Sequence, residues 1–387
     1  MGPLQGVKVI EFAGIGPAPM CAMLLADLGA TVLRIDRPEP AKIGIERPLR
    51  FNTLLRNRPS MSLDLKNPES VGFAKELIAN SDVLIEGFRP GTMERLGLGP
   101  TPCLEVNPRL VYGRMTGWGQ TGPLAHTAGH DLNYIALSGA LHAIGRKGHP
   151  PTPPLNLVGD FGGGAVMLAF GLLAGVIHAR TSGVGQVVDA AMLDGAATLM
   201  TSFFGMHAAG LLNAERGSNV LDSGSHYYDV YECADGKYLS VAPIESKFRT
   251  EFFQLLEISP HPTGGETALR AQIAERIRTR TQSEWQSLFD GTDACVSPVL
   301  SYADVAQHPH NKARNVFVEI DGVTQPAPAP RFSATPAQLP TPPAHPDANL
   351  FEALSPWGLD QQRIDGLVSR SILRTPATIG AESSHAN

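Results

Sequence analysis

The stretch GVKVIEFAGIGPAPMCAMLLADLGATVLRID, residues 6–36, decides the fold of this chain. Residues 6–12 are rich in Val and Ile and predict a buried β-strand, residues 20–28 predict a helix that ends at Gly29, and residues 31–35 predict a second strand. A strand, a helix and a strand in this order form a β-α-β unit, whose strands pair in parallel through a right-handed crossover. The sequence therefore predicts an α/β domain built on a parallel sheet.

The turn between this first strand and its helix is Gly14-Ile-Gly16-Pro-Ala-Pro19. Two glycines before a helix, with Asp36 at the end of the next strand, are typical of proteins that bind a nicotinamide dinucleotide. The third glycine of that fingerprint, which lets the helix pack closely on the strand, is replaced by Pro19. A nicotinamide enzyme is therefore a disfavoured alternative.

Strand-like runs at 82–86, 110–115 and 186–190 and a helix at 67–80 continue the same alternation. Near residue 215 the pattern changes to a β-hairpin with strands at 227–232 and 238–242. We expect five parts. A large domain begins with residues 1–190, a linker helix follows at 191–214, and a small α/β domain covers 215–310. A return linker and the C-terminal part of the large domain cover 311–360, and the tail, 361–387, is expected to be partly disordered, with the disorder beginning at about residue 372.

The 387 residues are 43% hydrophobic and 18% charged, which is enough apolar material for two packed domains. The net charge of −6, without long runs of Lys or Arg, argues against binding to nucleic acid or to an anionic membrane. The most apolar run, 165–177, is too short to span a bilayer. The four cysteines are widely spaced without a CxxC pair, which predicts neither a metal site nor disulfides and favours a cytoplasmic location.

Two short motifs carry the residues best suited to chemistry, Gly-His-Asp-Leu-Asn-Tyr (129–134) and Gly-Asp-Phe-Gly-Gly-Gly (159–164). His130 has small and polar neighbours, and Asp160 is expected at a helix start, where backbone N–H groups and the helix dipole favour an anion. An imidazole, a carboxylate and such a helix start are what proton transfer next to a carbonyl requires. The alternatives are a simple helix N-cap for Asp160 and a hydrogen-bonded structural histidine for His130.

Arginines gather after two of the predicted strands. Guanidinium groups bind phosphate oxygens in pairs and stack on flat rings, so we expect them to hold a nucleotide-like group; a solvated charged loop is the alternative. The segment 87–91 follows the strand 82–86 directly and lies at the carboxyl edge of the sheet, where open parallel sheets bind ligands. The arginines of the earlier loop are Arg37, Arg47, Arg50, Arg56 and Arg58.

With these residues placed, the chain resembles the α-methylacyl-CoA racemases of the family III CoA-transferase superfamily, from Gly6 to about Phe332. Gly-His-Asp-x-Asn-Tyr (129–134), followed later by Ile244-Glu245, is typical of the racemase branch, whereas Asp160 and the arginines are common to the superfamily. The other matching stretches are 11–17, 27–30, 34–38, 55–58, 82–99, 115–123, 156–164, 185–192, 227–236 and 293–298.

The resemblance implies a large CoA-binding domain with a Rossmann-like parallel sheet and a smaller α/β domain, in an interlocked homodimer whose active sites lie at the interface. It also implies a racemase or epimerase of lipid metabolism, which inverts the 2-methyl centre of 2-methylacyl-CoA thioesters by two-base transfer of the α-proton through an enolate. No metal and no redox cofactor are expected, since the coenzyme A thioester is itself the substrate.

Residue by residue, the resemblance makes His130 and Asp160 the two proton-transfer bases. Glu245, from the partner subunit, would hold the tautomer of His130. Coenzyme A would be contacted by Arg37, Arg56, Arg89 and Arg95. The reacting end of the substrate would be lined by Ile15, Asp131, Tyr134, Asn156 and Tyr228.

Two alternatives stay open for the site. One is a CoA-transferase of the same superfamily, in which Asp160 is a nucleophile and His130 is not needed; the other is a CoA-binding protein without catalysis. The chain departs from the family at Asp222-Ser-Gly-Ser-His226, where Gly-Gly-Ala-Pro is more usual before the paired tyrosines, and around 42–48 in the arginine-rich loop. Both departures bear on the choice of acyl chain, which the sequence leaves undetermined.

Overall fold

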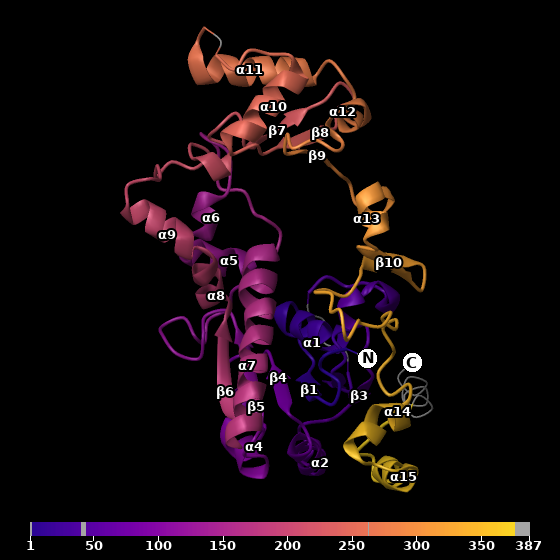
Figure 1. Ribbon diagram of the computed structural model, residues 1–387. Coiled ribbons are helices and arrows are strands. Elements are labelled where there is room, and N and C mark those ends of the chain that lie inside the picture. The colour runs from indigo at the N-terminus through magenta and orange to yellow at the C-terminus, as the bar shows by residue number, and fades with distance from the viewer. Residues whose placement is uncertain (1, 40–43, 262, 376–387) are drawn as a thin grey trace, which may run out of the picture. The chain divides into compact units, whose positions relative to one another are not determined.

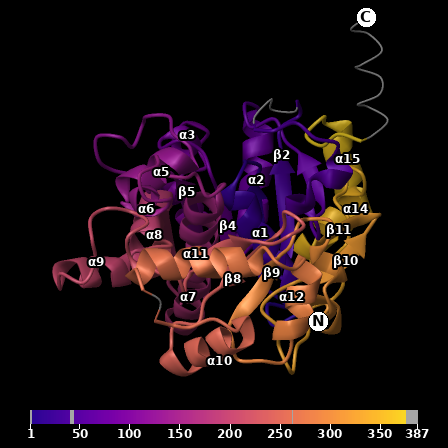
Figure 2. The same ribbon diagram turned by 90° about the horizontal axis from the view of Figure 1, so that it is seen from above.

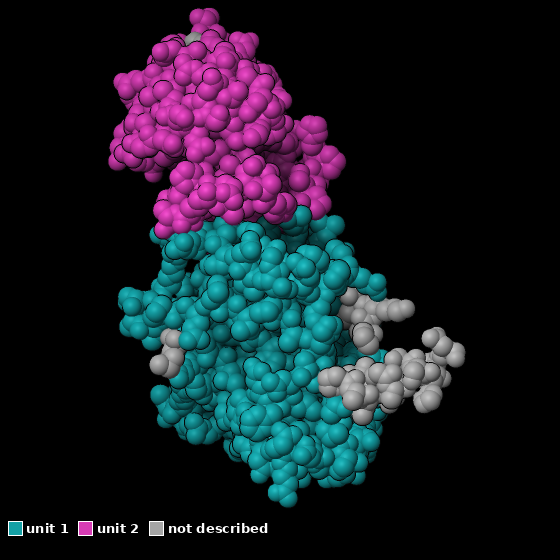
Figure 3. Space-filling view, turned by 90° about the vertical axis from the view of Figure 1, so that its right-hand side faces the viewer, with its two compact units in different colours: residues 1–138, 155–199, 314–387 teal, residues 139–154, 200–313 magenta. Residues whose placement is uncertain are grey.

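The computed structural model of the protein describes residues 2–39, 44–261 and 263–375 (Figure 1). The chain forms two compact units, shown in different colours in Figure 3. Unit 1 comprises residues 1–138, 155–199 and 314–387, and unit 2 comprises residues 139–154 and 200–313. The division differs in detail from the predicted one, because 139–154 belongs to unit 2 and the predicted linker helix 191–214 is two helices, one in each unit.

Unit 1 is built around a six-stranded parallel sheet of order β3-β2-β1-β4-β5-β6. The strands are β1 (Lys8–Phe12), β2 (Thr31–Asp36), β3 (Ser60–Ser62), β4 (Val83–Glu86), β5 (Val111–Thr116) and β6 (Gln186–Ala191). The chain moves outward from β1 through β2 and β3, then outward on the other side through β4, β5 and β6. The predicted parallel, Rossmann-like sheet is confirmed, and its reversal point lies between β1 and β4.

Helices cover both faces of this sheet. The helices of unit 1 are α1 (Pro17–Asp27), α2 (Pro68–Ala79), α3 (Thr92–Arg95), α4 (Pro100–Val106), α5 (Asp131–Leu137), α7 (Met167–Ser182), α8 (Met192–Leu199), α14 (Leu350–Leu354) and α15 (Gln361–Ser369). Val9 and Val32 point into the core under α1 and α7, whereas Ile10 and Leu33 point into the core under α2 and α15. Neighbouring strand residues thus fill opposite layers, and α7 lies along β5 and β6 (Figure 1).

The C-terminal segment is more ordered than the sequence predicted. α14 and α15 lie next to each other against the sheet core (Figure 2), and the indole Nε1 of Trp357 donates to Ser81 Oγ at 2.8 Å. Ile372 and Leu373 are only 3% and 2% exposed in the same core. The expectation of disorder from about residue 372 was wrong for these two residues, since their apolar side chains complete the layer under α15; residues 376–387 lie outside the described part of the chain.

Two short elements of unit 1 were not predicted. β3 has three residues, too few for a periodic pattern, and it is held by Asp347, whose Oδ1 accepts from Ser62 N at 2.8 Å. The antiparallel pair β10 (Phe317–Ile320) and β11 (Val323–Pro326) lies within the expected return linker. β3 is held by residues remote in sequence, so local pattern does not reveal it. The β10–β11 pair is a local hairpin that turns at Asp321-Gly322, a turn signal that the sequence analysis did not use.

Unit 2 contains a three-stranded antiparallel sheet packed on helices. β7 (Asp229–Glu232) pairs with β8 (Tyr238–Val241), and β8 pairs with β9 (Val296–Val299), which confirms the predicted hairpin. The helices are α6 (Ala140–Ala143), α9 (Thr201–Ala208), α10 (Ser246–Leu256), α11 (Gly265–Ile277), α12 (Gln282–Phe289) and α13 (Pro309–Ala313). α12 begins at a capping box, with Thr281 N donating to Glu284 Oε2 at 2.8 Å. The five 3₁₀ helices of the described chain are Leu49–Phe51, Thr53–Leu55, Val220–Asp222, Val305–Gln307 and Ser355–Trp357.

The longest helical run, residues 157–182, is longer than the apolar run predicted at 165–177. Its 26 residues are long and apolar enough to cross a membrane by length and composition alone, although 44% of its most apolar window is buried inside the structure. Core helices of soluble proteins pass the same test. In unit 1 this run packs against β5 and β6 and forms one wall of the hydrophobic core.

Arg56, predicted to contact coenzyme A, is instead a buried structural residue of unit 1. Its side chain donates to Asp27 Oδ1 at 3.2 Å and to Asp27 Oδ2 at 2.5 Å. Its remaining donors reach Gln325 Oε1 at 2.9 Å and the carbonyl of Pro326 at 2.7 Å. At 3% exposure, with four of its five N–H donors engaged, Arg56 ties α1 to β11 within the interior of unit 1.

Replacement of Asp27 by Ala should strongly destabilise the protein, because it leaves the Arg56 guanidinium buried without its counter-ion. Breaking a buried pair in this way typically costs about 3–5 kcal/mol of unfolding free energy. Urea denaturation is the measurement. The matched control is Glu76→Ala, which breaks the half-exposed pair of Glu76 with Arg363 and should cost no more than about 1 kcal/mol. Equal losses in the two variants would contradict the structural role of Arg56.

Candidate active site

The loops after β1 and β4 meet at the carboxyl edge of the sheet, where a ligand site was predicted. The loop after β1 ends at Gly16, whose φ of +67° suits a residue without a side chain, and α1 follows. The loop after β4 begins with Gly87, where an added Cβ would lie 3.3 Å from the Cβ of Ala18 in α1. The loop after β4 is therefore in close contact with the first turn of α1 at the reversal point of the sheet.

Asp160 lies on a π-helix beside the loop after β1. The π-helix, η3 (Leu157–Val166), continues into α7; helices of this kind are rare and frequently occur at functional sites. An added Cβ on Gly16 would lie 3.0 Å from Asp160 Oδ2, so the loop approaches the carboxylate because residue 16 is glycine. The sequence suggested Gly16 as one glycine of a dinucleotide-binding fingerprint. In the structure, the lack of a side chain at Gly16 makes room for the Asp160 carboxylate.

The predicted N-cap role of Asp160 belongs to another residue. Asn156 occupies the N-cap position of the π-helix, and its Nδ2 donates to Asp160 Oδ2 at 3.0 Å. Asn156 was predicted at the reacting end of the substrate and does lie beside the candidate base. The Asp160 carboxylate is therefore oriented by a side chain and is not used to cap its own helix.

Asp131 joins the two candidate bases through the backbone. Its Oδ2 accepts from the backbone N–H groups of Gly159 and of Asp160, both at 2.7 Å. The side chain is buried, at 6% exposure for the residue, and an added Cβ on Gly159 would lie 2.5 Å from Oδ2. Asp131 follows His130 in the chain, so one carboxylate fixes the start of α5 against the π-helix that carries Asp160. The sequence placed Asp131 at the reacting end and did not predict this bridge.

His130 is the residue before the first turn of α5, with an extended backbone. Its N–H donates to Asn133 Oδ1 at 3.0 Å, and its carbonyl accepts from Asn133 N at 2.8 Å. The residue is exposed, and its side chain takes part with Asn133 in a capping box at the start of α5. The helix start fixes its backbone and leaves the imidazole accessible.

Tyr134, predicted at the reacting end, supports the turn that delivers His130. Its hydroxyl donates to the carbonyl of Gly129, and its ring packs edge-on against Trp118 with the centroids 4.7 Å apart. An added Cβ on Gly117 would lie 2.0 Å from this ring, which explains why the loop after β5 is rich in glycine. Burial, followed by the charge of Asp160, raises the pKa of Tyr134 to about 12. Tyr134 is therefore a neutral, buried support.

The environment of Asp160 favours its protonated form. Burial raises the pKa of this carboxyl above its ordinary value, and the nearby charge of Asp131 adds to the rise. The hydrogen bond from Asn156 and the charge of His130 oppose these effects without cancelling them. Asp160 and His130 thus influence each other electrostatically, and a carboxyl with a raised pKa can accept and return a proton.

The other predicted CoA contacts are exposed at the same edge of the sheet. Arg37 follows β2, and its guanidinium lies 5.7 Å from the centroid of the Phe88 ring in the loop after β4. Arg89 follows Phe88 and is near enough to Tyr134 to oppose the rise in its pKa. Arg95 lies in α3, where it donates to Thr92 Oγ1 at 3.1 Å. Ile15, predicted near the acyl end, is exposed in the loop after β1.

Glu86 supports this arginine-bearing loop, and the sequence did not single it out. It is the last residue of β4, is buried, and accepts from Phe88 N at 2.7 Å and from Arg114 Nε at 2.9 Å. Burial raises the pKa of its carboxyl, whereas these hydrogen bonds oppose the rise. The only sequence signal for this supporting role of Glu86 was its position as an acidic residue at the end of an otherwise apolar strand.

Glu245 and Tyr228, the remaining predicted site residues, belong to unit 2. Glu245 precedes the first turn of α10, and Tyr228 lies in the loop before β7. In the described part of the chain, no group of three or more His, Cys, Asp or Glu side chains is arranged to hold a metal ion. The four cysteines are free thiols.

A parallel sheet whose strand order reverses between β1 and β4, covered by helices on both faces, defines a Rossmann-like α/β protein. Residues 4–349 match the family described as CoA-transferase family III, and the chain belongs to that family. Among solved structures, a CAIB/BAIF family protein from Brucella suis aligns with a TM-score of 0.78 and 25% identity, over 93% of this chain and 100% of that one.

Curated relatives cover most of the chain. Alpha-methylacyl-CoA racemase of Mus musculus is 39% identical over 96% of this chain and 98% of its own length. The racemase of the same name from Homo sapiens is 41% identical over 86% of this chain and 87% of its own length. The succinyl-CoA–L-malate CoA-transferase beta subunit of Chloroflexus aurantiacus is 30% identical over 96% of this chain and 98% of its own length.

Replacement of Asp160 by Asn should stabilise the protein at neutral pH. Since the pKa of Asp160 is raised on folding, its contribution to stability is complete below the pKa of an unfolded aspartate, about 3.9, and is lost as the pH rises through the raised value. The amide stays uncharged at every pH and can keep the hydrogen bond from Asn156. We expect a higher urea midpoint for the variant at pH 7 and no difference near pH 3.5.

The matched control is Asp194→Asn, at an exposed carboxylate in α8 of the same unit. It should shift the midpoint little at either pH. A variant at position 160 that is less stable than the wild type at pH 7, or a shift that does not depend on pH, would contradict the inferred environment of Asp160.

Proposed function

We propose that the protein is a racemase of 2-methylacyl-CoA thioesters. The observation that carries the proposal is the connection of His130 to Asp160 through the buried carboxylate of Asp131. An exposed imidazole and a carboxyl whose pKa is raised by burial are two groups suited to accept and return a proton. The two relatives named alpha-methylacyl-CoA racemase, at 39% and 41% identity, support the choice.

The proposed reaction inverts the α-carbon in two proton transfers. The thioester carbonyl acidifies the α-hydrogen, so one of His130 and Asp160 can remove it, and the bonding electrons move onto the thioester oxygen as an enolate. The other group then delivers a proton to the opposite face, and the electrons return. Inversion follows because the two groups approach opposite faces of the same carbon. The backbone N–H groups of Gly159 and Asp160 do not serve the enolate oxygen, because they donate to Asp131 Oδ2.

The coenzyme A part of the substrate would bind along the carboxyl edge of the sheet. Arg37, Arg89 and Arg95 are exposed there and carry guanidinium groups suited to phosphate oxygens. Arg37 and Phe88 together offer a flat surface for a ring. Arg56 has no part in this binding, because its donors are used within the protein.

Glu245 and Tyr228 would complete the site from unit 2. A carboxylate hydrogen-bonded to an imidazole fixes which ring nitrogen carries the proton, and Glu245 would do this for His130. We further propose a cytoplasmic homodimer with these residues supplied by the partner subunit. Phe170 and Ile177 on α7 support an association, since they are 72% and 67% exposed although large and apolar.

A CoA-transferase is the second candidate, supported by the relative from Chloroflexus aurantiacus. In that reaction the Asp160 carboxylate would attack the thioester and form a mixed anhydride with release of the CoA thiolate. The thiolate would then attack the aspartyl carbonyl, which forms an aspartyl-CoA thioester and frees the first carboxylate. A second carboxylate would take the CoA by the reverse of these two steps. His130 would not be needed. The two reactions are therefore separated by the fate of the α-hydrogen and by the effect of removing His130.

Incubation of either enantiomer of a 2-methylacyl-CoA in deuterated water should give deuterium at carbon 2 together with inversion. His130→Ala and Asp160→Asn should each slow inversion by about 100-fold or more, as loss of a general acid or base typically does. His126→Ala is the matched control, since this histidine is exposed four residues earlier in the same loop, and its rate should equal that of the wild type.

An α-hydrogen that stays protium in the wild-type protein would end the racemase proposal. Transfer of CoA to a second carboxylic acid, with full activity in His130→Ala, would identify a transferase. Binding of CoA in calorimetry with neither reaction would identify a binding protein. Undiminished racemisation by His130→Ala would remove His130 from the mechanism.

A further inference from the structure

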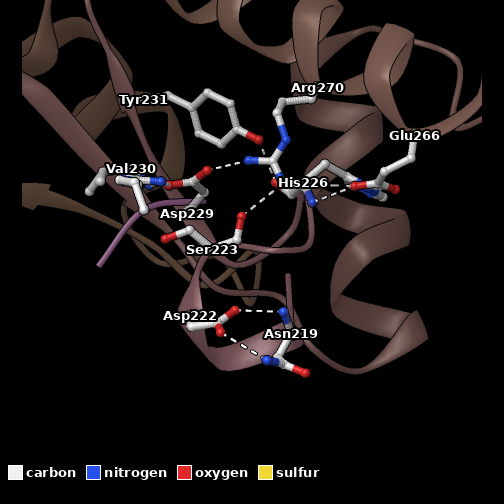
Figure 4. Close-up of polar contacts among 10 residues, drawn as sticks. Asn219, Asp222, Ser223, His226, Asp229, Val230, Tyr231, Glu266 and Arg270 are labelled. Atoms are coloured by element: carbon white, nitrogen blue, oxygen red, sulfur yellow. Dashed lines mark hydrogen bonds and ion pairs between the residues drawn. The ribbon is translucent and has the colours of Figure 1, made fainter. Parts of the chain in front are cut away.

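One carboxylate of unit 2 holds a histidine that departs from the family pattern. His226 is 8% exposed, and its Nδ1 lies 2.6 Å from Glu266 Oε2 (Figure 4). The backbone N–H of the same residue donates to Glu266 Oε1 at 2.7 Å. Glu266, in the first turn of α11, therefore holds both the ring and the backbone of His226, which fixes the loop before β7 to a helix remote in sequence.

The rest of this loop is held from the same helix. The Asp229 carboxylate is buried and pairs with Arg270 of α11 and with Arg146. Arg270 also donates to the carbonyl of Ser223 at 3.0 Å, and the Tyr231 hydroxyl donates to the carbonyl of His226 at 2.6 Å (Figure 4). The backbone from Ser223 to Tyr231 is thus anchored before, at and after His226.

From His226 the contacts continue to the residues that the proposed function needs. The imidazole packs edge-on against the Tyr227 ring, with the centroids 5.0 Å apart, and the Arg249 guanidinium lies 4.3 Å from the centroid of Tyr227. Arg249 Nη1 donates to the carbonyl of Ile244 at 2.5 Å. Tyr228 is the next residue after Tyr227, and Glu245 is the next after Ile244, so this series of contacts ends at the chain neighbours of both proposed site residues of unit 2.

We propose that His226, held by Glu266, is a positioning residue that fixes Tyr227 and Tyr228 and, through Arg249, sets the backbone of Glu245 for the reaction. The inference rests on the proposed function, which brings Tyr228 and Glu245 to the substrate. It assigns a role to the segment 222–226, where the sequence departs from its family.

The alternative is that the pair only stabilises unit 2, and its exposure argues against a large contribution. The Glu266 side chain is 52% exposed, and an ion pair open to solvent contributes little to stability. Desolvation raises the pKa of Glu266, but the hydrogen bonds from His226 outweigh it and lower the pKa below its ordinary value. A carboxylate that accepts from both the ring and the backbone of one residue restricts where that residue lies, which is the property a positioning role requires.

The test combines kinetics with amide hydrogen exchange of the loop. In His226→Ala, exchange in a peptide covering 219–229 should accelerate, and kcat/KM for racemisation should fall about 10-fold to 100-fold, since small displacements of a positioned group have effects of this size. The dissociation constant of free coenzyme A should stay within twofold, because the arginines that bind it belong to unit 1. His226→Asn, whose Nδ2 takes the place of the imidazole Nδ1, should recover most of both losses.

Glu232→Gln is the matched control, because it removes one charge from the surface pair of Glu232 with Arg278 in the same unit. It should change neither the loop exchange nor the rate. Faster loop exchange in His226→Ala with unchanged kcat/KM would overturn the proposal, as would an equal loss in Glu232→Gln or a parallel loss of coenzyme A binding. Absence of racemisation by the wild type would refute the proposed function. In that case, the amide hydrogen exchange of the variants in the peptide 219–229 would still show whether the contact between Glu266 and His226 restricts the motion of the loop.

Discussion

The site depends on the hydrogen bonds from Gly159 N and Asp160 N to the carboxylate of Asp131. Each charge-assisted bond of this kind contributes about 1.5–3 kcal/mol, and the pair is buried where water does not replace it. Asp131 begins α5 directly after His130, and the two N–H groups that donate to it lie in the first turn of the helix of Asp160. The separation of the two candidate bases is therefore set by a rigid contact between two helix starts, not by flexible loops.

This arrangement places function and stability in opposition at one residue. Burial raises the pKa of Asp160, so ionisation of this carboxylate lowers the free energy of unfolding of the protein. Two glycines make room for the carboxylates. Gly16 lets the loop after β1 approach the Asp160 carboxylate, and Gly159 lets the Asp131 carboxylate approach the π-helix. A Cβ at either position would contact a carboxylate oxygen. A π-helix at the same place is consistent with a segment selected for geometry over stability.

Much of this architecture follows from local pattern. Apolar strands, a glycine-rich turn and helix-start signals predict the β-α-β unit, the parallel sheet and the hairpin of unit 2. The edge of the sheet that carries Arg37 and Arg89 follows from topology. Local pattern does not reveal contacts between remote residues, so it placed Arg56 among arginines for a nucleotide-like group. The family resemblance assigned Arg56 to coenzyme A, although Asp27 and Gln325 accept its hydrogen bonds. For the same reason it missed the bridging role of Asp131 and the order of Ile372 and Leu373.

The most direct test of the account is isotope exchange by variants that keep only one of the two bases. In deuterated water, His130→Ala should exchange the α-hydrogen of one enantiomer of a 2-methylacyl-CoA without inverting it, and Asp160→Ala should exchange only the other. This outcome requires two bases on opposite faces of the α-carbon. Exchange of both enantiomers at equal rates by either variant would contradict the assignment, because a single base would then serve both faces.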